Sequence, residues 1–389
     1  MSETVTVTNR GAERIHAGHR WIYRADLAGA GAGASAGAVV AVADTRGRRL
    51  GDALYSDRSQ IALRMVTTGD EQVSAGLWRA RLGAAVRFRA TLAIDATAYR
   101  LVNADADLLP SLVVDRYGDF LVLQALSQGA DRLLPQVIPT LVDLCAPRGI
   151  LARNDAKVRL LEGLEQRVEV VHGEVPERVE VVEGGVRFEA DLFKGQKTGL
   201  FLDQRENRDA AARYASGRLL DCFTYNGGFG LRAARTCEQV IAIDASAEAC
   251  ARVRANAALN GFANVEVREA NVFDELRELD RAGERFDTVV LDPPAFAKSR
   301  AALPKAIGGY KEINLRALRL LRPGGYLVTC TCSYHVDEAT FGEIVYAAAI
   351  DTGSTVTVVE KRMQGRDHPV MLGVPETYYL KCFVLRKLS

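Results

Sequence analysis

Two short loops of this chain contain the residue types that could perform chemistry. The first reads Asp292-Pro-Pro-Ala-Phe296 and the second reads Thr331-Cys-Ser333, and each follows an apolar, β-branched run. We therefore predict each loop at the carboxyl end of a β-strand, where ligands bind in an open parallel sheet. A carboxylate with two prolines at one strand end and a thiol at another indicate chemistry on a flat heterocycle. The leading candidate is a pyrimidine of RNA.

The thiol loop holds two cysteines, Cys330 and Cys332, which would share one face of a strand because they are two residues apart. Addition of a thiolate to C6 of a pyrimidine makes C5 nucleophilic enough to accept a methyl group, and a base must then remove the C5 proton. Cys332 is nearer the strand end, so we predict it as the nucleophile and Cys330 as a buried structural residue. A buried structural cysteine is the alternative for Cys332 as well.

The carboxylate loop resembles motif IV of amino-group methyltransferases, (D/N)-P-P-(Y/F), with one residue inserted. Its prolines lack N–H donors, so backbone carbonyls can point at an exocyclic amine. Asp292 could hold the edge of a base or the amine of a cofactor, and Phe296 could stack on a base or pack in the core. Lys298 and His335 are candidate charge or proton partners, and His368 either lines the site or caps a loop.

A glycine-rich turn, Asp221–Gly230, follows the first strand of the C-terminal half of the chain. Glycines let the backbone pass close to a ligand and turn sharply into a helix. Dinucleotide enzymes and S-adenosylmethionine (SAM) methyltransferases both have such a turn, but the strict G-x-G-x-x-G spacing is absent here. The acidic residue Asp221 suits a cationic amino-acid group better than a pyrophosphate, which favours SAM over a nicotinamide cofactor.

Two further strand ends carry polar residues that could complete a cofactor site. Asp244 follows the glycines by about twenty residues, where a carboxylate can accept hydrogen bonds from ribose hydroxyls; the alternative is a helix N-cap. Asn271 could meet an adenine amino group, or it could be an ordinary turn residue. The predicted catalytic residues are Cys332 and Asp292, and no metal site is predicted. The cofactor-binding residues predicted around these strand ends are Asp221, Phe223, Tyr225, Asn226, Gly227, Gly228, Asp244, Ala245, Asn271, Val272 and Asp292.

The elements that must position these residues alternate regularly from residue 217 onward. Apolar runs at 218–223, 239–243, 265–268, 288–291 and 326–332 are separated by segments of helical periodicity. Alternation of this kind predicts a parallel sheet with helices on both faces, an α/β Rossmann-like domain. A final pair of apolar runs, 356–361 and 378–385, is expected to close the sheet as a hairpin at its edge.

The first half of the chain has a different organisation. Residues 4–68 contain short alternating runs that predict a small β-rich unit, and residues 70–93 change to helical spacing. Strands, a helix near 131–145 and more strands then predict a middle α+β domain that ends before 190. Because 389 residues exceed one ordinary core, we predict three domains, at 1–70, 71–190 and 191–389.

The composition is that of a soluble globular protein, with 48% hydrophobic and 25% charged residues. No run approaches a membrane span, no signal segment is evident, and the seven cysteines include no C-x-x-C. These features predict a cytoplasmic protein with reduced thiols, and they leave the oligomeric state open, a homodimer included. The net charge is +1, yet residues 1–93 hold thirteen Arg, no Lys and eight Asp or Glu. This local excess suits phosphate contacts, although GC-rich coding would also enrich arginine.

With these residues in view, the chain resembles the bacterial 23S ribosomal RNA cytosine-5 methyltransferases that carry an N-terminal PUA domain. The resemblance extends over nearly the whole length, and the sharpest marker is the segment from Lys197-Thr-Gly to Asp203-Gln-Arg205. The other motifs that carry it are Arg20-Trp-Ile-Tyr23, the segment 105–118 that ends in Asp115-Arg-Tyr-Gly118, Phe223–Gly230, Asp292-Pro-Pro-Ala-Phe296, Thr331-Cys-Ser333 and Asp367-His-Pro369.

The resemblance implies a PUA domain, a middle β-β-α-β-β domain and a Rossmann-like SAM domain. It also implies that Phe201, Gln204 and Arg205 help form the SAM pocket and that Cys332 is the nucleophile. Two departures are visible. Asn271 stands where relatives often have Asp, and motif IV lacks the second cysteine of the two-cysteine enzymes, so release of product needs another base, either Asp292 or water.

The leading hypothesis is therefore methylation of C5 of a cytosine in 23S ribosomal RNA through a covalent Cys–C6 adduct. The first alternative keeps the fold and cofactor but methylates guanine N7 or an exocyclic amine without thiol chemistry. The second alternative is a non-catalytic RNA-binding assembly protein. Because the target base must leave its stack, we expect naked or partly assembled ribosomal RNA as the substrate and no membrane partner.

Overall fold

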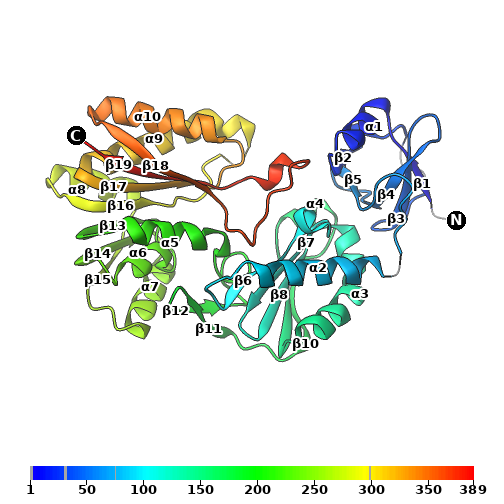
Figure 1. Cartoon of the computed structure of the whole chain (residues 1–389), viewed down its shortest axis with the longest axis horizontal. Helices are drawn as coiled ribbons and strands as arrows, with labels where there is room; N and C mark the ends of the chain where they lie inside the picture. Colours follow the sequence, from blue (N-terminus) through cyan, green and yellow to red (C-terminus); the bar gives the residue numbers. More distant parts are fainter. Residues whose placement is uncertain (1–2, 30–32, 75, 298) are drawn as a thin grey trace. The chain divides into compact units, whose positions relative to one another are not determined.

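The computed structural model describes residues 3–29, 33–74, 76–297 and 299–389, and its chain forms two compact units (Figure 1). Unit 1 consists of Met1–Val181, Ala190–Leu202 and Arg366–Thr377. Unit 2 consists of Val182–Glu189, Asp203–Gly365 and Tyr378–Ser389. Each unit therefore contains stretches of chain that are distant in sequence, and the predicted loops at 292–296 and 331–333 both belong to unit 2.

The N-terminal part of unit 1 is a five-stranded sheet, as the alternating runs predicted. Its strand order is β1-β3-β4-β5-β2. A helix that the alternating runs did not predict, α1, follows β1. The hydroxyl of Thr8 caps this helix by accepting a hydrogen bond from the backbone N–H of Gly11. The elements are β1 (Thr4–Thr6), α1 (Asn9–His16), β2 (Trp21–Tyr23), η1 (Arg24–Asp26), β3 (Val39–Ala43), β4 (Arg49–Tyr55) and β5 (Ile61–Met65).

The rest of unit 1 contains a second five-stranded sheet, with the order β10-β9-β8-β7-β6. Helix α2 is the predicted helix near 70–93, and β7 and β8 form the predicted hairpin, with Gly118 in the left-handed region (φ 59°) at its turn. The elements are α2 (Leu77–Thr91), β6 (Ala98–Asn103), η2 (Ala104–Asp107), β7 (Leu112–Tyr117), β8 (Phe120–Ala125), α3 (Gln128–Cys145), β9 (Gly149–Asn154), α4 (Val158–Leu161), β10 (Arg167–Gly173) and η5 (Pro375–Thr377).

Unit 2 is built on a seven-stranded sheet with the order β15-β14-β13-β16-β17-β19-β18. Strands β13 to β17 are parallel, whereas β19 runs antiparallel to β17 and β18 runs antiparallel to β19. The Rossmann-like core and its closing hairpin are thus confirmed. The strands are β13 (Arg218–Cys222), β14 (Gln239–Asp244), β15 (Val265–Glu269), β16 (Phe286–Leu291), β17 (Leu321–Thr331), β18 (Val356–Met363) and β19 (Lys381–Lys387).

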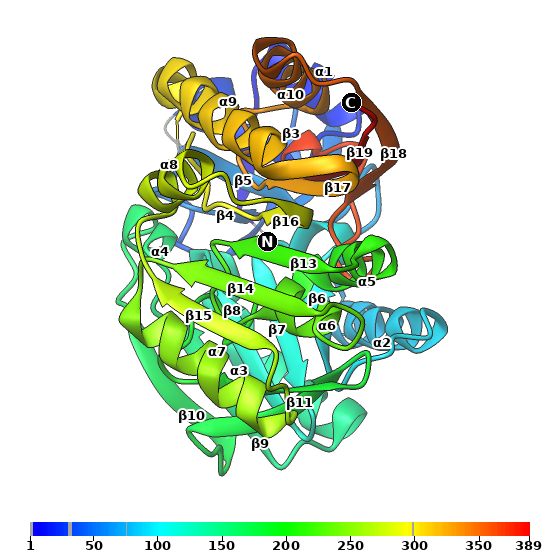
Figure 2. The ribbon, with the colours of Figure 1, turned by 90° about the vertical axis from the view of Figure 1, so that its left-hand side faces the viewer.

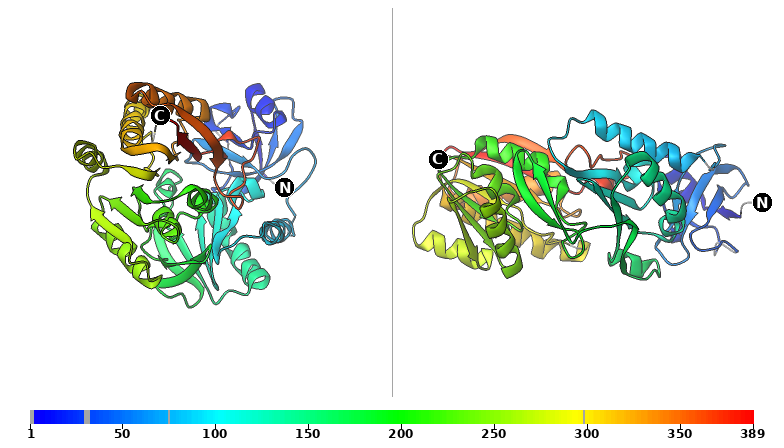
Figure 3. Two further views of the ribbon diagram at one scale, coloured as in Figure 1. Left: turned by 60° about the vertical axis from the view of Figure 1, so that its left-hand side comes forward. Right: turned by 90° about the horizontal axis from the view of Figure 1, so that it is seen from below.

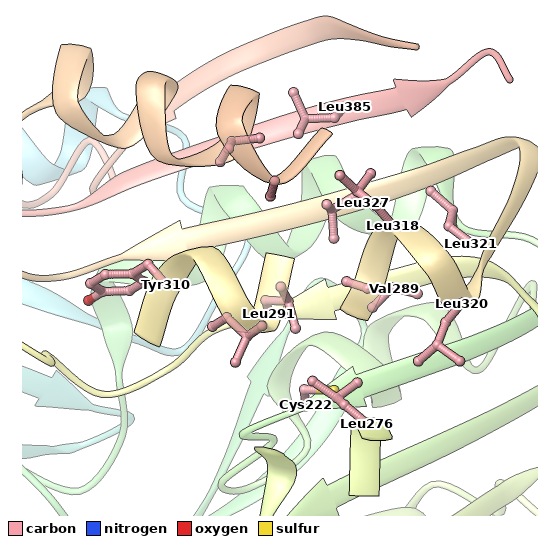
Figure 4. Packing of buried hydrophobic residues seen from close by; sticks show 14 of the residues in the cluster. Cys222, Leu276, Val289, Leu291, Tyr310, Leu318, Leu320, Leu321, Leu327 and Leu385 are labelled. Carbon is pink, nitrogen blue, oxygen red and sulfur yellow. The ribbon is translucent and has the colours of Figure 1, made fainter. Parts of the chain in front are cut away.

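Helices lie on both faces of this sheet (Figure 3). On one face, buried side chains of α8, α9 and α10 pack on the central strands. Figure 4 shows part of this core, where Val289 and Leu291 of β16 lie near Leu327 of β17. On the other face, α5 and α6 cover a second apolar cluster. The helices are η3 (Leu202–Gln204), α5 (Arg205–Tyr214), α6 (Gly228–Ala233), α7 (Ala247–Leu259), α8 (Val272–Arg281), η4 (Arg300–Ala302), α9 (Leu303–Leu320) and α10 (Glu338–Thr352).

A separate two-stranded ribbon, β11 (Arg178–Glu183) and β12 (Val186–Asp191), completes the fold. Within the described ranges, no helix has the length and apolar character needed to cross a membrane. Nor do the described residues contain a group of three or more His, Cys, Asp or Glu placed to hold a metal ion.

Candidate functional site

The strand order of unit 2 brings the two predicted halves of the site together at the carboxyl ends of the parallel strands. Strand β13 lies between β14 and β16, so the order of the strands reverses at this point (Figure 2). In parallel sheets the crevice outside the carboxyl ends at such a reversal binds ligands. The cofactor half follows β13, β14 and β15, and the chemical half follows β16 and β17.

The cofactor half begins with Asp221, a buried residue near the end of β13. Its Oδ2 accepts hydrogen bonds from the Thr224 hydroxyl (2.6 Å) and from the Gly230 backbone N–H (2.9 Å). Its Oδ1 is also buried and has no hydrogen-bond partner among the described residues. Burial raises the pKa of this carboxyl to about 6. A cationic ligand would stabilise the carboxylate form.

The turn after β13 has an unusual backbone shape. Phe223 (φ 62°) and Tyr225 (φ 55°) occupy the left-handed region, which costs free energy for residues with side chains. The turn is held closed because Gly227 N donates to Thr224 O (2.9 Å) and Thr224 N donates to Ile243 O of β14 (3.1 Å). Strain of this kind is sustained only where the surroundings impose it, as they do at many ligand-binding turns.

Two glycines of this turn have no room for a side chain. A Cβ at Gly228 would be 2.4 Å from Arg208 Nε, and a Cβ at Gly230 would be 2.8 Å from Asp221 Oδ2. Both distances are shorter than real Cβ atoms tolerate. The glycine spacing therefore reflects close packing between the turn, the carboxylate of β13 and helix α5. Asn226 is buried, and its backbone carbonyl accepts a hydrogen bond from the Asn256 side chain (3.0 Å).

Asp244, at the end of β14, is oriented toward the glycine-rich turn. Its Oδ2 accepts a hydrogen bond from Tyr225 N (3.0 Å), and its Oδ1 accepts one from Ser246 N (3.0 Å). The N-cap of α7 is Ser246, whose hydroxyl accepts from Ala249 N. Asp244 is therefore not the helix cap, and ribose binding by its half-buried carboxylate stays a prediction. Ala245, the next residue, is exposed.

Asn271 lies at the start of helix α8. Its Oδ1 accepts a hydrogen bond from Phe273 N (3.0 Å), which makes it the N-cap of α8. Val272 is buried in the core against the sheet. A contact between Asn271 and an adenine amino group stays a prediction, and the side-chain oxygen that would make it already accepts one hydrogen bond.

The chemical half brings the carboxylate loop and the thiol loop together. Strands β16 and β17 are adjacent and parallel, with Leu291 paired to Thr329. The Cys332 Sγ is 3.9 Å from the carbonyl oxygen of Pro293, and the Cys332 side chain is half-buried. Cys330 is fully buried, and burial raises the pKa of its thiol. The geometry thus favours Cys332 over Cys330 as the sulfur that a substrate could reach.

Gln204 connects the sharpest sequence marker to the carboxylate loop. Its Nε2 donates a hydrogen bond to Asp292 Oδ1 (2.7 Å), and its Oε1 accepts one from Asn207 Nδ2 (2.6 Å). The neighbouring Arg205 is buried and pairs with Glu206 at 3.0 Å. Phe201 belongs to unit 1, where the Lys197 ammonium lies 4.6 Å from the centre of its ring.

Buried carboxylates are concentrated beside Asp292. The pKa of Asp292 is raised to about 7, chiefly by burial. The negative charges of Asp203 and Asp221 also raise it, and the Arg208 guanidinium and the Gln204 hydrogen bond oppose them. Arg208 also forms a buried ion pair with Glu183 at 2.8 Å. This part of the sheet edge consequently favours a ligand that brings positive charge.

Known proteins identify the family of this chain. A model of the S-adenosylmethionine-dependent methyltransferases matches residues 156–371, and a model of PUA-like domains matches residues 5–68. A Tolumonas auensis protein named Ribosomal RNA large subunit methyltransferase I is 40% identical over 397 residues, covering 100% of both chains. A protein of the same name from Aeromonas salmonicida is 41% identical over 379 residues, covering 95% of each.

The chain belongs to this family of S-adenosylmethionine-dependent methyltransferases. Solved structures agree in fold. A protein described as a methyltransferase complexed with SAH has a TM-score of 0.85 at 20% identity, covering 99% of this chain and 100% of its own. A protein described as a SAM-dependent methyltransferase from Streptococcus mutans has a TM-score of 0.83 at 19% identity, with the same coverage. The predicted family, enzyme class and cofactor are confirmed.

The residues at the sheet edge fit SAM, whose sulfonium and ammonium groups are both positive. Asp221 offers a buried carboxylate oxygen that lacks a partner among the described residues, and its neighbour Asp292 is held at a raised pKa by burial and like charge. Binding of a cofactor of this charge would lower the pKa values of Asp221 and Asp292 by stabilising their ionised forms. We take this match of charge as the physical reason for the acidic residues in the turn.

Tyr310 is a site residue that the sequence analysis missed. Its hydroxyl accepts a hydrogen bond from Thr331 Oγ1 (2.8 Å) and lies 2.9 Å from Ser333 Oγ, which in turn accepts from Ala297 N (3.1 Å). Tyr310 lies on α9 and is fully buried. Through these hydrogen bonds it connects the two loops of the chemical half. Its place in a helix, outside any loop motif, gave no local signal of this role.

The remaining candidates have other described contacts or lie outside the described residues. His335 is half-buried beside Tyr334, with ring centroids 5.4 Å apart. His368 is buried in unit 1, where its Nδ1 is 3.0 Å from Asp367 Oδ1. Lys298 lies outside the described residues.

The segment that leads into the site is anchored within unit 1. Thr198 Oγ1 donates to Asp115 Oδ2 (2.5 Å) and lies 3.0 Å from the Tyr117 hydroxyl, which accepts a hydrogen bond from Leu200 N (3.0 Å). The Asp-Arg-Tyr-Gly turn and the Lys-Thr-Gly segment are thus two sides of one buried network. This contact gives a physical reason for both motifs to occur in the same chain.

The arginines of residues 1–93 mostly have partners inside unit 1. Arg64 pairs with the buried Glu162 at 2.8 Å, and Arg81 donates to the carbonyls of Val66 and Leu108. The local charge excess therefore exaggerates the number of guanidinium groups left for phosphate. The other arginines with acceptors in the same unit are Arg10, Arg14, Arg20, Arg24, Arg48, Arg49, Arg58, Arg79 and Arg89.

Proposed function

We propose that this protein methylates C5 of a cytosine in 23S ribosomal RNA, with Cys332 as a covalent nucleophile. The observation that carries the proposal is the position of the Cys332 sulfur, 3.9 Å from the carbonyl oxygen of Pro293 at the tip of the neighbouring strand. The name shared by the relatives, Ribosomal RNA large subunit methyltransferase I, supports the class of substrate.

The chemistry divides between two side chains of unit 2. The Cys332 thiolate adds to C6 of the cytosine, forming an S–C6 bond and placing the electron pair of the C5–C6 double bond on C5. SAM supplies the methyl group that C5 then takes up. A base removes the proton from C5, the double bond re-forms, and the S–C6 bond breaks to return the thiolate.

We propose that Asp292 acts together with Cys332 on the target cytosine. With a pKa of about 7, this carboxyl is close to the balance between its acid and base forms at neutral pH. The ionised form can accept the C5 proton or a hydrogen bond from the cytosine amino group. Gln204 fixes its orientation through the 2.7 Å hydrogen bond to Oδ1, which leaves Oδ2 for the base.

RNA binding is proposed for the N-terminal domain, and the match of residues 5–68 to PUA-like domains supports this assignment. The three-domain division at 1–70, 71–190 and 191–389 is retained as part of the proposal. The target base must leave its stack to reach the thiol, so the proposed substrate is naked or partly assembled 23S ribosomal RNA. Binding through phosphates should weaken as salt increases.

The test compares Cys332→Ala with the matched control Cys330→Ala. Each purified variant is incubated with 23S RNA transcript and SAM, and the nucleosides are quantified by mass spectrometry. We expect Cys332→Ala to lose 5-methylcytidine formation by at least about a thousandfold, while SAM binding measured by calorimetry is unchanged. Cys330→Ala should stay within a few-fold of the wild type because its buried sulfur does not contact substrate.

A second measurement traps the covalent step. RNA containing 5-fluorocytidine cannot release a proton from C5, so the proposed adduct should persist and migrate as a protein–RNA complex in a denaturing gel, except with Cys332→Ala. Retained methylation by Cys332→Ala, or 7-methylguanosine as the product, would replace this proposal with methylation that needs no thiol.

A further inference from the structure

Lys381 is a buried lysine at the start of β19, next to the thiol loop. It is paired with Thr331 of β17 in the antiparallel register, and its side chain is 1% exposed. Lysine is rarely found at such burial unless its charge has partners. The position matters because Thr331 is adjacent to Cys332.

The Lys381 ammonium is turned toward the loop that carries Cys332. Its Nζ donates to the carbonyl oxygens of Ser333 (3.4 Å) and Tyr379 (3.5 Å), and it lies 5.1 Å from the centre of the Tyr378 ring. Both hydrogen bonds are long, so the carbonyls compensate only part of the cost of burying the charge.

Three negative groups favour the protonated form of Lys381. They are Asp337 and Glu338 at the start of α10, and the thiolate of Cys332. Burial alone lowers the pKa of Lys381, and these charges oppose that effect. The coupling is reciprocal: a thiolate that stabilises the ammonium is stabilised by it to the same extent.

Two described groups near the Cys332 sulfur do not favour a thiolate. The Pro293 carbonyl oxygen presents negative partial charge at 3.9 Å. The Tyr310 hydroxyl lies in the same loop network. Burial is the main cause that raises the pKa of Tyr310, and the negative charge of Cys332 raises it too. Lys381, on β19, is a cation from another element, and its charge favours the reactive thiolate form of the sulfur.

We propose that Lys381 is a positioning residue whose ammonium holds the Cys332 sulfur as a thiolate. This inference rests on the proposed function in assigning the thiolate a purpose, but the interaction itself is a property of the free protein. The competing explanation is structural: the lysine could serve only to hold the carbonyls of the loop.

The experiment measures the pH dependence of alkylation at Cys332 in the full-length protein, using iodoacetamide and peptide-resolved mass spectrometry. Three variants are compared with the wild type. Lys381→Met removes the charge at similar length, and Lys381→Arg keeps it. Lys387→Met is the control. Lys387 lies on the same strand, but at the end that is far from the thiol. Its ammonium donates to the carbonyls of Leu318 (2.8 Å) and Leu321 (3.0 Å).

We expect Lys381→Met to move the midpoint of Cys332 alkylation upward by about one to two pH units, and so to slow alkylation at neutral pH about tenfold or more. Lys381→Arg should restore most of the shift, and Lys387→Met should leave the midpoint unchanged. The methylation rate of Lys381→Met should recover toward that of the wild type as pH increases. Unchanged SAM binding and an unchanged thermal midpoint show that the variant is folded.

An alkylation midpoint that stays within about 0.2 units in a folded Lys381→Met protein would overturn the proposal and leave the structural explanation. A different outcome is also possible: Lys381→Met shifts the alkylation midpoint, but the wild-type protein forms no 5-methylcytidine. That result would reject the proposed function and keep the thiolate interaction. The two failures are therefore distinguishable, because alkylation requires neither RNA nor SAM.

Discussion

The two halves of the site are built in different ways. In the cofactor half, Asp221 is held by Gly230, nine positions further on, and Asp244 is held by Tyr225, nineteen positions earlier. In the chemical half, Asp292 is oriented by a glutamine 88 positions away, and the carbonyl after Cys332 is bound by a lysine 48 positions away.

This difference separates what local sequence determines from what the fold must supply. The cofactor half is a turn whose own glycines and carboxylates define its shape, so it is recognisable as a motif. The chemical half consists of two reactive side chains whose protonation and orientation depend on helices α5 and α9 and on strand β19. We therefore expect changes in the first half to affect SAM affinity and changes in the second to affect turnover.

The largest expected effect is that of Asp292→Asn. It keeps the hydrogen-bond acceptor for Gln204 but removes the base, so we expect the methylation rate to fall about a hundredfold or more. At SAM concentrations well below saturation, the wild-type rate should increase as pH rises through about 7, where Asp292 of the free enzyme ionises, and the variant should lack this step. Asp287→Asn, at the opposite end of β16, is the matched control. A main effect on SAM affinity would move Asp292 to the cofactor half.

The next largest effect is expected for Gly230→Ala. The added Cβ would be 2.8 Å from Asp221 Oδ2 and would displace the carboxylate that the turn holds. We expect the Kd for SAM, measured by calorimetry, to increase about tenfold, with alkylation of Cys332 unchanged. Gly308→Ala, in an exposed part of α9 with open space around it, should bind SAM normally. Loss of thiol reactivity in Gly230→Ala would contradict the separation of the halves.

A smaller effect on turnover than that of Asp292→Asn is expected for Tyr310→Phe. Loss of the hydroxyl removes the acceptor of the Thr331 hydroxyl and one of the partners of Ser333 Oγ, which costs about 1–3 kcal/mol. We expect turnover to fall up to about tenfold while the Kd for SAM stays the same. Tyr214→Phe, which removes a hydroxyl that donates to Glu360 on the opposite face of the sheet, should keep full activity. Weakened SAM binding without loss of turnover would reject the role of Tyr310.

The smallest effect concerns stability. The folded pKa of Asp292, about 7, exceeds the ordinary value of 3.8, so protonation favours the folded state below about pH 4 and this stabilisation is lost as pH rises through 7. Asp292→Asn should therefore raise the thermal midpoint of the SAM-free protein by about 2–4 °C at pH 8 and by less at pH 5, where the unfolded chain has lost the proton but the folded protein has kept it. An equal shift at both pH values would indicate a packing effect instead.

Periodicity predicted the elements that position the site with few errors. The parallel strands of unit 2, the hairpin at its edge and the hairpin at Gly118 all follow from apolar runs and turn residues. Helix α1 was missed because its eight residues are short and mostly polar. Within the site, Asp221 and the glycines could be predicted because their partners are local.

The long-range contacts could not be predicted from local signals. Gln204 entered only through a family resemblance, and nothing in its own segment indicates that it reaches Asp292. Tyr310 and Lys381 are a helical tyrosine and a strand lysine, and neither has a loop motif. The arginine excess illustrates the opposite error, because composition reports charge but not the partners, such as Glu162, that neutralise it.

The position of β19 in the sheet has a consequence for the synthesis of the protein. It is the last strand in sequence, yet it lies between β17 and β18 instead of at the edge. A nascent chain made from its N-terminus can form the parallel strands β13 to β17 early, but the gap beside β17 stays open until residues 381–387 leave the ribosome. The sheet therefore closes beside β17 only after residues 381–387 have been made, and a chain shortened before them would contain the cofactor turn without a finished sheet beside the thiol.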